Sequence, residues 1–276
     1  MSGTLYVVAV PIGNPDDLSS RARDTLARVT VVAAEDTRHF ATLARHHDIG
    51  TPAVSYHDHN EEARSRELLR RLGAGDDVAL VSDAGTPLVS DPGYRLVRAA
   101  IEAGIEVTSV PGASAVMAAL SASGLPPHPF RFVGFLPRTA AARRSALEGI
   151  ARDPATIVAF EAPRRLADTL RDALATLGDR PACLARSLTK RHERYQRGSL
   201  SALIVELEAE AEVRGECTIV IGGATEQTSS GADAEADARL LLANGAPARA
   251  VQVLLQARHG LSKRDAYALV LRSQKP

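Results

Sequence analysis

Three short segments rich in glycine, proline and serine follow apolar runs and have the residue types of a small-ligand site. Ligands of open α/β sheets bind outside the carboxyl ends of the strands, where a glycine lets the backbone approach closely. The exposed N–H and C=O groups of such turns suit a nucleoside, and a helix N-terminus at Ser114 suits a carboxylate. A plain turn or cap explains each segment alone, but three together predict one site for a nucleoside joined to an amino acid. The segments are Val10–Asn14, Ser82–Pro87 and Val110–Ala115.

Charged side chains that could orient a hydroxyl group or accept its proton follow other apolar runs. Glu35, Asp36 and Arg38 come directly after the run Val29–Ala34, so they would emerge at the carboxyl edge of a sheet. A structural ion pair between Asp36 and Arg38 explains them equally well. Lys190 is the only lysine before residue 263 in a chain rich in arginine, and a partly desolvated amine can lose its proton whereas a guanidinium cannot. Lys190 is therefore assigned as a proton acceptor or a phosphate contact.

Histidines and acidic residues lie close together between residues 46 and 61, which raises the question of a metal site. Their spacing matches no standard ligand pattern, so a polar loop facing the substrate is the preferred interpretation. The turn at Val10–Asn14 likewise lacks the G-x-G-x-x-G spacing of a dinucleotide site. Phe160 suits an adenine-stacking ring and a core residue equally, whereas Asp91 is interpreted as a helix cap. The residues of the loop are His46, His47, Asp48, His57, Asp58, His59 and Glu61.

Apolar runs that resemble buried strands alternate with helical spacing from the start of the chain, which is typical of a doubly wound α/β fold. The helix over Leu18–Val29 is expected to have Asp16 or Asp17 as its N-cap. A later helix is expected to have Asp91 as its cap and Pro92 in its first position. The predicted strands of this part are Leu5–Ile12, Val29–Ala34, Val78–Val81 and Val107–Val110.

The Pro-rich segment Ser121–Pro129 predicts a boundary between two α/β domains, residues 1–120 and 121–224. The second domain is expected to be richer in strands of mixed direction. Residues 225–236 are small, polar and acidic and predict a linker. Residues 237–276 are expected to form a separate helical tail, in which seven Lys and Arg against two Asp leave a net charge of +5. Ser262 and Asp265 have the spacing of a capping box in that tail.

Composition limits the class of protein. The chain has equal numbers of basic and acidic residues, 33 of each. It therefore has no net positive charge that would attract nucleic acid, and RNA contacts would come from local basic patches. Cys183 and Cys217 lie in apolar runs and are expected to be buried and free in a reducing compartment. No segment approaches the ~20 apolar residues of a membrane span, and the N-terminus lacks a signal-peptide pattern. The chain is therefore expected to be soluble and cytoplasmic, with no metal.

A series of short motifs occurs in order between Leu5 and Gly223: Leu5–Asn14, Ala34–Arg38, Ser55–Glu61, Ser82–Pro87, Pro111–Ala115, Gly134–Pro137, Phe160–Arg165 and Ser187–Lys190. This series resembles the signatures of the ribosomal RNA small subunit methyltransferase I family, which has the tetrapyrrole methylase fold. The family usually has threonine, proline, serine and histidine where this chain has Val10, Ala113, Ala162 and Arg164. Ser187 also replaces a glutamate that the family tends to keep near its site.

The resemblance implies a homodimeric, two-domain enzyme with S-adenosylmethionine in a cleft between the domains. It implies methyl transfer to the 2′-hydroxyl of a cytidine in the decoding region of 16S rRNA, in the small ribosomal subunit. The catalytic candidates are Lys190, Glu35, Asp36 and Arg38. The implied cofactor contacts are Pro11, Gly13, Asn14, Asp83, Ala84, Gly85, Pro87, Leu88, Ser114, Ala115, Phe160, Glu161 and Leu188. The substrate candidates are His57, His59, Asn60, Arg138, Arg164, Lys263 and Arg264.

Two other functions stay open. The chain could be a methylase of a small molecule or a protein on the same fold, as tetrapyrrole and diphthamide-pathway enzymes are. Those enzymes lack a basic helical tail and the motifs Ala34–Arg38 and Ser55–Glu61. The chain could also be a non-catalytic RNA binder in ribosome assembly, although its intact turns and Lys190 argue against this. The tail would dock RNA or brace the dimer, and its charge favours RNA.

Overall fold

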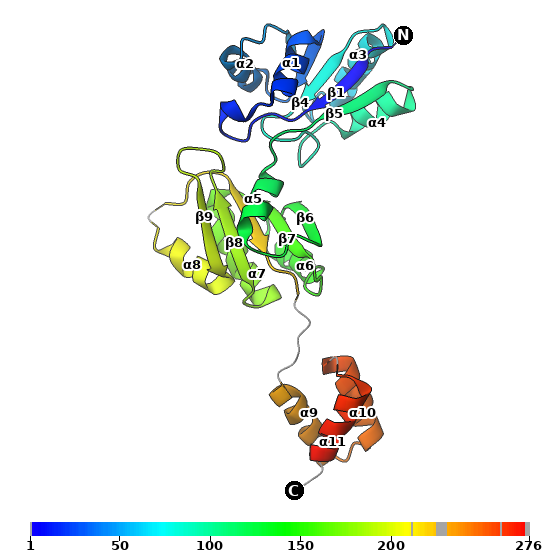
Figure 1. The fold of residues 1–276 in the computed structure, drawn as a ribbon, viewed down its shortest axis with the longest axis vertical. Coiled ribbons are helices and arrows are strands. Elements are labelled where there is room, and N and C mark those ends of the chain that lie inside the picture. Colours follow the sequence, from blue (N-terminus) through cyan, green and yellow to red (C-terminus); the bar gives the residue numbers. More distant parts are fainter. Residues whose placement is uncertain (1, 211, 225–230, 260, 274–276) are drawn as a thin grey trace. The chain divides into compact units, whose positions relative to one another are not determined.

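The structure is a computed structural model that describes residues 2–210, 212–224, 231–259 and 261–273. Figure 1 shows its helices and strands, coloured along the sequence. Contacts between residues divide the chain into two units. The first holds residues 1–149 and 156–222, and the second holds residues 150–155 and 223–276.

The first part of the chain folds around a parallel sheet covered by helices. Its strands are β1 (Thr4–Val8), β2 (Val31–Ala34), β3 (Ala53–Ser55), β4 (Val78–Val81) and β5 (Glu106–Val110), and its helices are α1 (Ser20–Arg28), α2 (Thr37–His46), α3 (Glu61–Gly73) and α4 (Tyr94–Glu102). The strand order is β3-β2-β4-β1-β5, and every pair is parallel. Side chains alternate along each strand, so Val8 packs with α1 and α2 while Leu5 packs with α3 and α4. This confirms the predicted doubly wound fold.

The start of α1 differs from the prediction because a nearer residue caps it. The Ser19 hydroxyl accepts a hydrogen bond from the backbone N–H of Ala22. Asp16 and Asp17 instead lie in a short 3₁₀ helix, η1 (Pro15–Asp17), whose cap is Asn14. The prediction of Asp16 or Asp17 as the cap is therefore wrong, because both lie in η1 and Leu18 separates them from the Ser19 cap.

The start of α4 also differs, and this difference matters for the site. The helix begins at Tyr94, and its N-terminal flanking residue is Gly93, at a φ of 131°. The prediction that Asp91 caps this helix and that Pro92 takes its first position is wrong. Strand β1 is also shorter than predicted, because it ends at Val8 and Ala9–Ile12 continue as a buried loop.

The second part of the chain forms a mixed sheet. Its strands are β6 (Phe130–Phe135), β7 (Thr156–Glu161), β8 (Pro181–Arg186), β9 (Arg194–Ser199) and β10 (Cys217–Ile221), and its helices are α5 (Ala115–Ser123), α6 (Ala140–Glu148), α7 (Leu166–Leu177) and α8 (Leu200–Glu208). The order is β6-β7-β10-β8-β9, with β6 and β7 parallel and the other pairs antiparallel. The mixed direction agrees with the prediction. Cys183 and Cys217 are buried and free on β8 and β10.

Helix α5 belongs to the core of this second sheet. Val116 and Leu120 pack with Val158, Cys183 and Val220. The helix ends at Gly124 in the left-handed region, as the sequence predicts. The change from one core to the other therefore comes before α5, whereas the predicted boundary at residue 120 lies inside it.

The second unit contains three helices, α9 (Gly231–Ala243), α10 (Ala248–His259) and α11 (Lys263–Ser273). Their shared core includes Ala238, Val251 and Leu269. Because α9 begins at Gly231, residues 231–236 of the predicted linker are helical, and residues 225–230 lie outside the described residues. The Ser262 hydroxyl accepts a hydrogen bond from the N–H of Asp265 at 3.1 Å, as the predicted capping box requires. Within the described ranges, no helix is long and apolar enough to cross a membrane.

Candidate active site

The loops after β1 and β4 are joined to each other at the carboxyl edge of the first sheet. Val10 and Gly85 exchange two backbone hydrogen bonds, of 2.9 and 3.0 Å. Gly85 has a φ of 76°, and a Cβ on it would lie 3.2 Å from Cγ2 of Ile12. Glycine is favoured here because it adopts this conformation at no steric cost. The two predicted turns thus form one continuous wall.

A third loop, after β8, closes on the same wall. Ser187 and Thr189 have positive φ values of 50° and 62°, a conformation that non-glycine residues adopt at a cost and that is concentrated at functional sites. The Thr189 hydroxyl oxygen accepts a hydrogen bond from the N–H of Asn14 at 2.9 Å. This bond fixes Lys190 beside Gly13, where a Cβ would lie 2.6 Å from Cγ of Lys190.

Replacing Gly13 with alanine is expected to displace this loop. The added Cβ would also lie 2.8 Å from the Leu188 carbonyl oxygen, so the backbone must move and the protein should lose about 1–3 kcal/mol of stability. Turnover should fall with it. Gly50→Ala is the matched control because nothing lies within 4 Å of its Cβ position. Unfolding in urea and initial rates measure both, and equal behaviour of the two variants would contradict this close packing.

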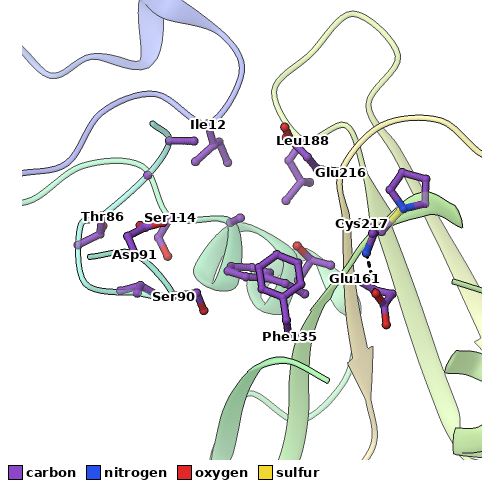
Figure 2. A pocket seen from close by; sticks show the side chains of 18 residues that line it. Ile12, Thr86, Ser90, Asp91, Ser114, Phe135, Glu161, Leu188, Glu216 and Cys217 are labelled. Atoms are coloured by element: carbon purple, nitrogen blue, oxygen red, sulfur yellow. Dashed lines mark hydrogen bonds between the residues drawn. The ribbon is translucent and has the colours of Figure 1, made fainter. Parts of the chain in front are cut away.

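A cavity of about 410 Å³ opens between these loops and the second sheet. Figure 2 shows Thr86, Ser90, Asp91 and Ser114 on one wall, with Leu188, Glu216 and Cys217 across from them. Seven of the residues predicted to contact a cofactor line it: Ala84, Gly85, Ser114, Ala115, Phe160, Glu161 and Leu188. Four distant segments of the chain are thus brought to one cavity.

A second, more polar cavity of about 590 Å³ adjoins the first, and the two share Ile12, Ala84 and Glu216. Lys190 lies at this second cavity, and its Nζ donates a hydrogen bond to Oε2 of Glu216 at 2.8 Å. Glu216 was not predicted as a site residue, and the apolar strand pattern that begins after it gives no signal for it. The residues of the prediction found here are Pro11, Gly13, Asp83, Ala84 and Lys190.

Phe160 and Glu161 have structural contacts as well as places in the first cavity. The Phe160 ring packs against Phe132 and Phe135, with centroids 4.9 and 5.5 Å away. Phe160 therefore packs in the core and also lines the cavity, and its stacking on adenine stays a prediction. The Glu161 carboxylate is fully buried, accepts a hydrogen bond from Thr169 Oγ1 at 2.6 Å and pairs with Arg165 at 3.3 Å. These contacts show that the Glu161 carboxylate stabilises the fold.

The predicted acidic motif lies beside the two cavities. Asp83 accepts a hydrogen bond from the Asp36 N–H at 3.0 Å, and Glu35 accepts one from the Asp83 N–H at 3.2 Å. Burial, with Asp83 as a nearby like charge, raises the pKa of Glu35. Asp36 forms an ion pair with Arg38 at 2.7 Å, and the hydrogen bonds from Arg38 hold the pKa of Asp36 below its usual range. The structure thus has the ion pair that the alternative interpretation predicts, and contact of these residues with a substrate stays a prediction.

Asp91 is the residue whose position the sequence predicts least well. It lines the first cavity rather than capping α4. Burial, together with the nearby Glu35, raises its pKa to about 7. The motif Ser90-Asp91-Pro92-Gly93 is equally typical of a helix start. Only the structure, in which α4 begins at Tyr94, shows that Asp91 lines the cavity.

Several predicted site residues lie away from the two cavities. Asn14, Pro87 and Leu88 support the loops without lining either cavity. His59 and Asn60 line a separate shallow pocket, and the Asn60 side-chain oxygen accepts a hydrogen bond from the His57 N–H. In the part of the chain that the structure describes, no group of three or more potential ligands is placed to hold a metal ion. The remaining exposed substrate candidates are Arg138 and Arg164 in the first unit and Lys263 and Arg264 in the second.

Comparisons with known proteins show which family this chain belongs to. The family model of the tetrapyrrole (corrin/porphyrin) methylases matches residues 4–204. A protein of Micromonospora olivasterospora named ribosomal RNA small subunit methyltransferase I is 52% identical over 98% of this chain and 87% of its own length. The chain belongs to this methyltransferase family. A Synechocystis protein of the same name is 45% identical over 98% of both chains.

Solved structures show the same fold. The uroporphyrin-III C-methyltransferase of Thermus thermophilus, in complex with S-adenosylhomocysteine, superposes with a TM-score of 0.56 at 25% identity. The match covers 80% of this chain and 97% of that one. The family's fold is therefore established for the part of the chain that holds both cavities.

Proposed function

We propose that the chain transfers the methyl group of S-adenosylmethionine to the ribose 2′-hydroxyl of a cytidine in the decoding region of 16S rRNA. The pair of adjoining cavities supports this most, because they share Ile12, Ala84 and Glu216. Displacement at a methyl group requires the donor and the acceptor to be held in line and close together. The names of the relatives support rRNA as the acceptor.

The residues of the first cavity fit S-adenosylmethionine. Ile12, Phe160 and Leu188 form an apolar wall for adenine, and its volume of about 410 Å³ is typical of small-molecule sites. The first-turn N–H groups of α5, next to Ser114, have no acceptor within their own helix and suit the carboxylate of the amino-acid end. When bound, the cofactor supplies an electrophilic methyl group on a positively charged sulfur.

Lys190 and Glu216 lie where the two cavities meet and are the groups we assign to the acceptor hydroxyl. A ribose hydroxyl is a weak acid, so it must be oriented and its proton must be removed. The Lys190 amine donates to Glu216 in the structure. In the proposed reaction the Lys190 amine accepts the hydroxyl proton as the methyl group passes from the sulfonium to the hydroxyl oxygen, and Glu216 pairs with the ammonium that results. Glu35 and Asp36 form hydrogen bonds with Asp83, which lines the polar cavity, and we assign them, with Arg38, as further contacts to the acceptor.

Methylation of purified acceptors tests this function. The protein is incubated with methyl-labelled S-adenosylmethionine and either small ribosomal subunits or free rRNA from cells lacking this gene. We expect label in 16S rRNA from at least one of these preparations, and comparing them shows which is the substrate. No label in either RNA would overturn the proposal.

The helical tail is proposed to contact rRNA phosphates through Lys263 and Arg264 at the start of α11, both exposed. Replacing both with glutamine should weaken RNA binding equally for all sequences, and should lower the slope of log K against log salt by about 2. Cofactor affinity should not change. Binding titrations at several salt concentrations measure the slope, and an unchanged slope would remove these two residues from the RNA interface.

We also propose that the protein is a homodimer in the cytoplasm, as the resemblance implies. Tyr94 and Ile101 on α4 are 63% and 61% exposed, and large apolar side chains of this kind mark contact surfaces when they cluster. Light scattering coupled to size-exclusion chromatography gives the mass directly. A mass of one chain at micromolar concentration would contradict the dimer.

A further inference from the structure

Three carboxyl groups line the first cavity: Asp91, Glu161 and Glu216. Glu161 is paired with Arg165, and Glu216 is paired with Lys190. Asp91 forms no ion pair within the described ranges, and the nearby Ser82 hydroxyl donates its hydrogen bond to the Ala84 carbonyl oxygen at 3.2 Å. Of the three, Asp91 alone thus has no cation within those ranges.

The backbone around Asp91 is held in an uncommon conformation. Leu88 and Ser90 have positive φ values of 72° and 75°, and Gly93 follows at 131°. Non-glycine residues keep such values only where the surrounding structure imposes them, and they are concentrated at ligand sites. These turns place Asp91 on the wall that also carries Ser90 and Ser114 (Figure 2).

The neighbours of Asp91 are themselves acidic. Glu35 follows β2 and Asp83 follows β4, and both act on the Asp91 carboxyl as like charges. Burial adds to this and raises the pKa of Asp91 to about 7. A cationic group in the cavity would offset this repulsion and favour the carboxylate form.

We propose that Asp91 binds the α-ammonium group of the cofactor, while the first turn of α5 takes the carboxylate of the same amino-acid end. The inference rests on the proposed function, because it concerns how S-adenosylmethionine is held. It assigns to Asp91 a role in recognising the amino-acid end, distinct from that of the apolar wall around the nucleoside. A charge-assisted hydrogen bond of this kind is among the stronger contacts in a binding site.

Proton linkage is a direct consequence of this contact. The ammonium stabilises the carboxylate, so the pKa of Asp91 falls when the ligand binds. Binding therefore releases a proton at and below the free-protein pKa of about 7, and affinity rises as the pH is raised toward that value. Above it Asp91 is already ionised, and the affinity becomes independent of this group.

Two ligands and two variants test the assignment by isothermal titration calorimetry. S-adenosylhomocysteine carries the ammonium and carboxylate groups, whereas 5′-methylthioadenosine has the same nucleoside without them. Asp91→Asn keeps the shape of the side chain and removes only its charge. It should weaken S-adenosylhomocysteine binding about 10- to 100-fold and leave 5′-methylthioadenosine binding unchanged. Glu102→Gln, which alters an exposed carboxyl that pairs with Arg98 on α4 and lines neither cavity, should leave both affinities and the proton release unchanged.

The number of protons released is measured by repeating the titrations in buffers of different ionisation enthalpy. The wild-type protein should release protons with S-adenosylhomocysteine near pH ~6.5, and Asp91→Asn should not. An equal loss of affinity for both ligands, or no loss for either, would overturn the assignment of Asp91. Failure of both ligands to bind the wild-type protein would instead contradict the proposed function.

Discussion

Replacing Lys190 with alanine is expected to lower kcat by about 100-fold or more while leaving the Kd of S-adenosylmethionine nearly unchanged. Lys190 lies at the polar cavity, and its Nζ is 2.8 Å from Glu216, a residue of both cavities. It is absent from the lining of the apolar cavity assigned to the cofactor. Single-turnover rates and a separate titration with S-adenosylhomocysteine measure the two quantities.

A second substitution separates the two roles that the sequence leaves open for this lysine. Lys190→Arg keeps the positive charge but cannot release a proton at neutral pH. We expect it to be nearly as inactive as Lys190→Ala, because the Lys190 amine must take up the hydroxyl proton. Recovery of most of the activity by arginine would show that the residue contacts phosphate instead. Near-normal turnover of Lys190→Ala would remove the residue from the mechanism.

Replacing Glu161 with alanine is expected to reduce the free energy of unfolding by about 3–5 kcal/mol. The carboxylate is fully buried, where it accepts hydrogen bonds from Thr169 and from the N–H of Ala162 and pairs with Arg165. Its removal leaves a guanidinium that is only 19% exposed without its carboxylate, which is costly. Unfolding in urea, followed by circular dichroism, measures the loss.

Glu208 provides the matched control for this prediction. It pairs with Arg171 at 2.7 Å, but both side chains are about half exposed, so Glu208→Ala should cost less than ~1 kcal/mol. If Glu161→Ala were as stable as this control but failed to bind S-adenosylhomocysteine, its carboxylate would belong to the cofactor site rather than to the fold.

Much of the fold follows from patterns that reflect burial directly. Strands β2 and β4 are apolar runs, buried at every residue, because helices cover both faces of their sheet, and such runs are visible in a sequence. Strand β3 was missed because it has only three residues, Ala53–Ser55, all partly exposed. The cap of α1 was misplaced because Asp16, Asp17 and Ser19 are all good capping residues, and only the turn of η1 selects Ser19.

The candidate site was predictable where glycine and proline mark a strand end. Gly13 and Gly85 reveal the two loops, since Gly13 permits the close approach of the Leu188 carbonyl and Gly85 adopts a φ of 76°. Glu216 and Asp91 carry no such mark. Asp91 follows residues whose positive φ values redirect the chain, and that redirection arises from packing of the whole loop rather than from local preference. A carboxyl group at a strand end or before a helix therefore shows its role only in three dimensions.

The identity of the atom that receives the methyl group tests ribose methylation most directly. After transfer from methyl-labelled S-adenosylmethionine to small subunits lacking the modification, 16S rRNA is digested to nucleosides and separated by liquid chromatography with mass spectrometry. We predict that the label appears in 2′-O-methylcytidine, and that Lys190→Ala abolishes it. Label on a nucleobase, or label only in ribosomal protein, would contradict ribose methylation at the site formed by the two adjoining cavities.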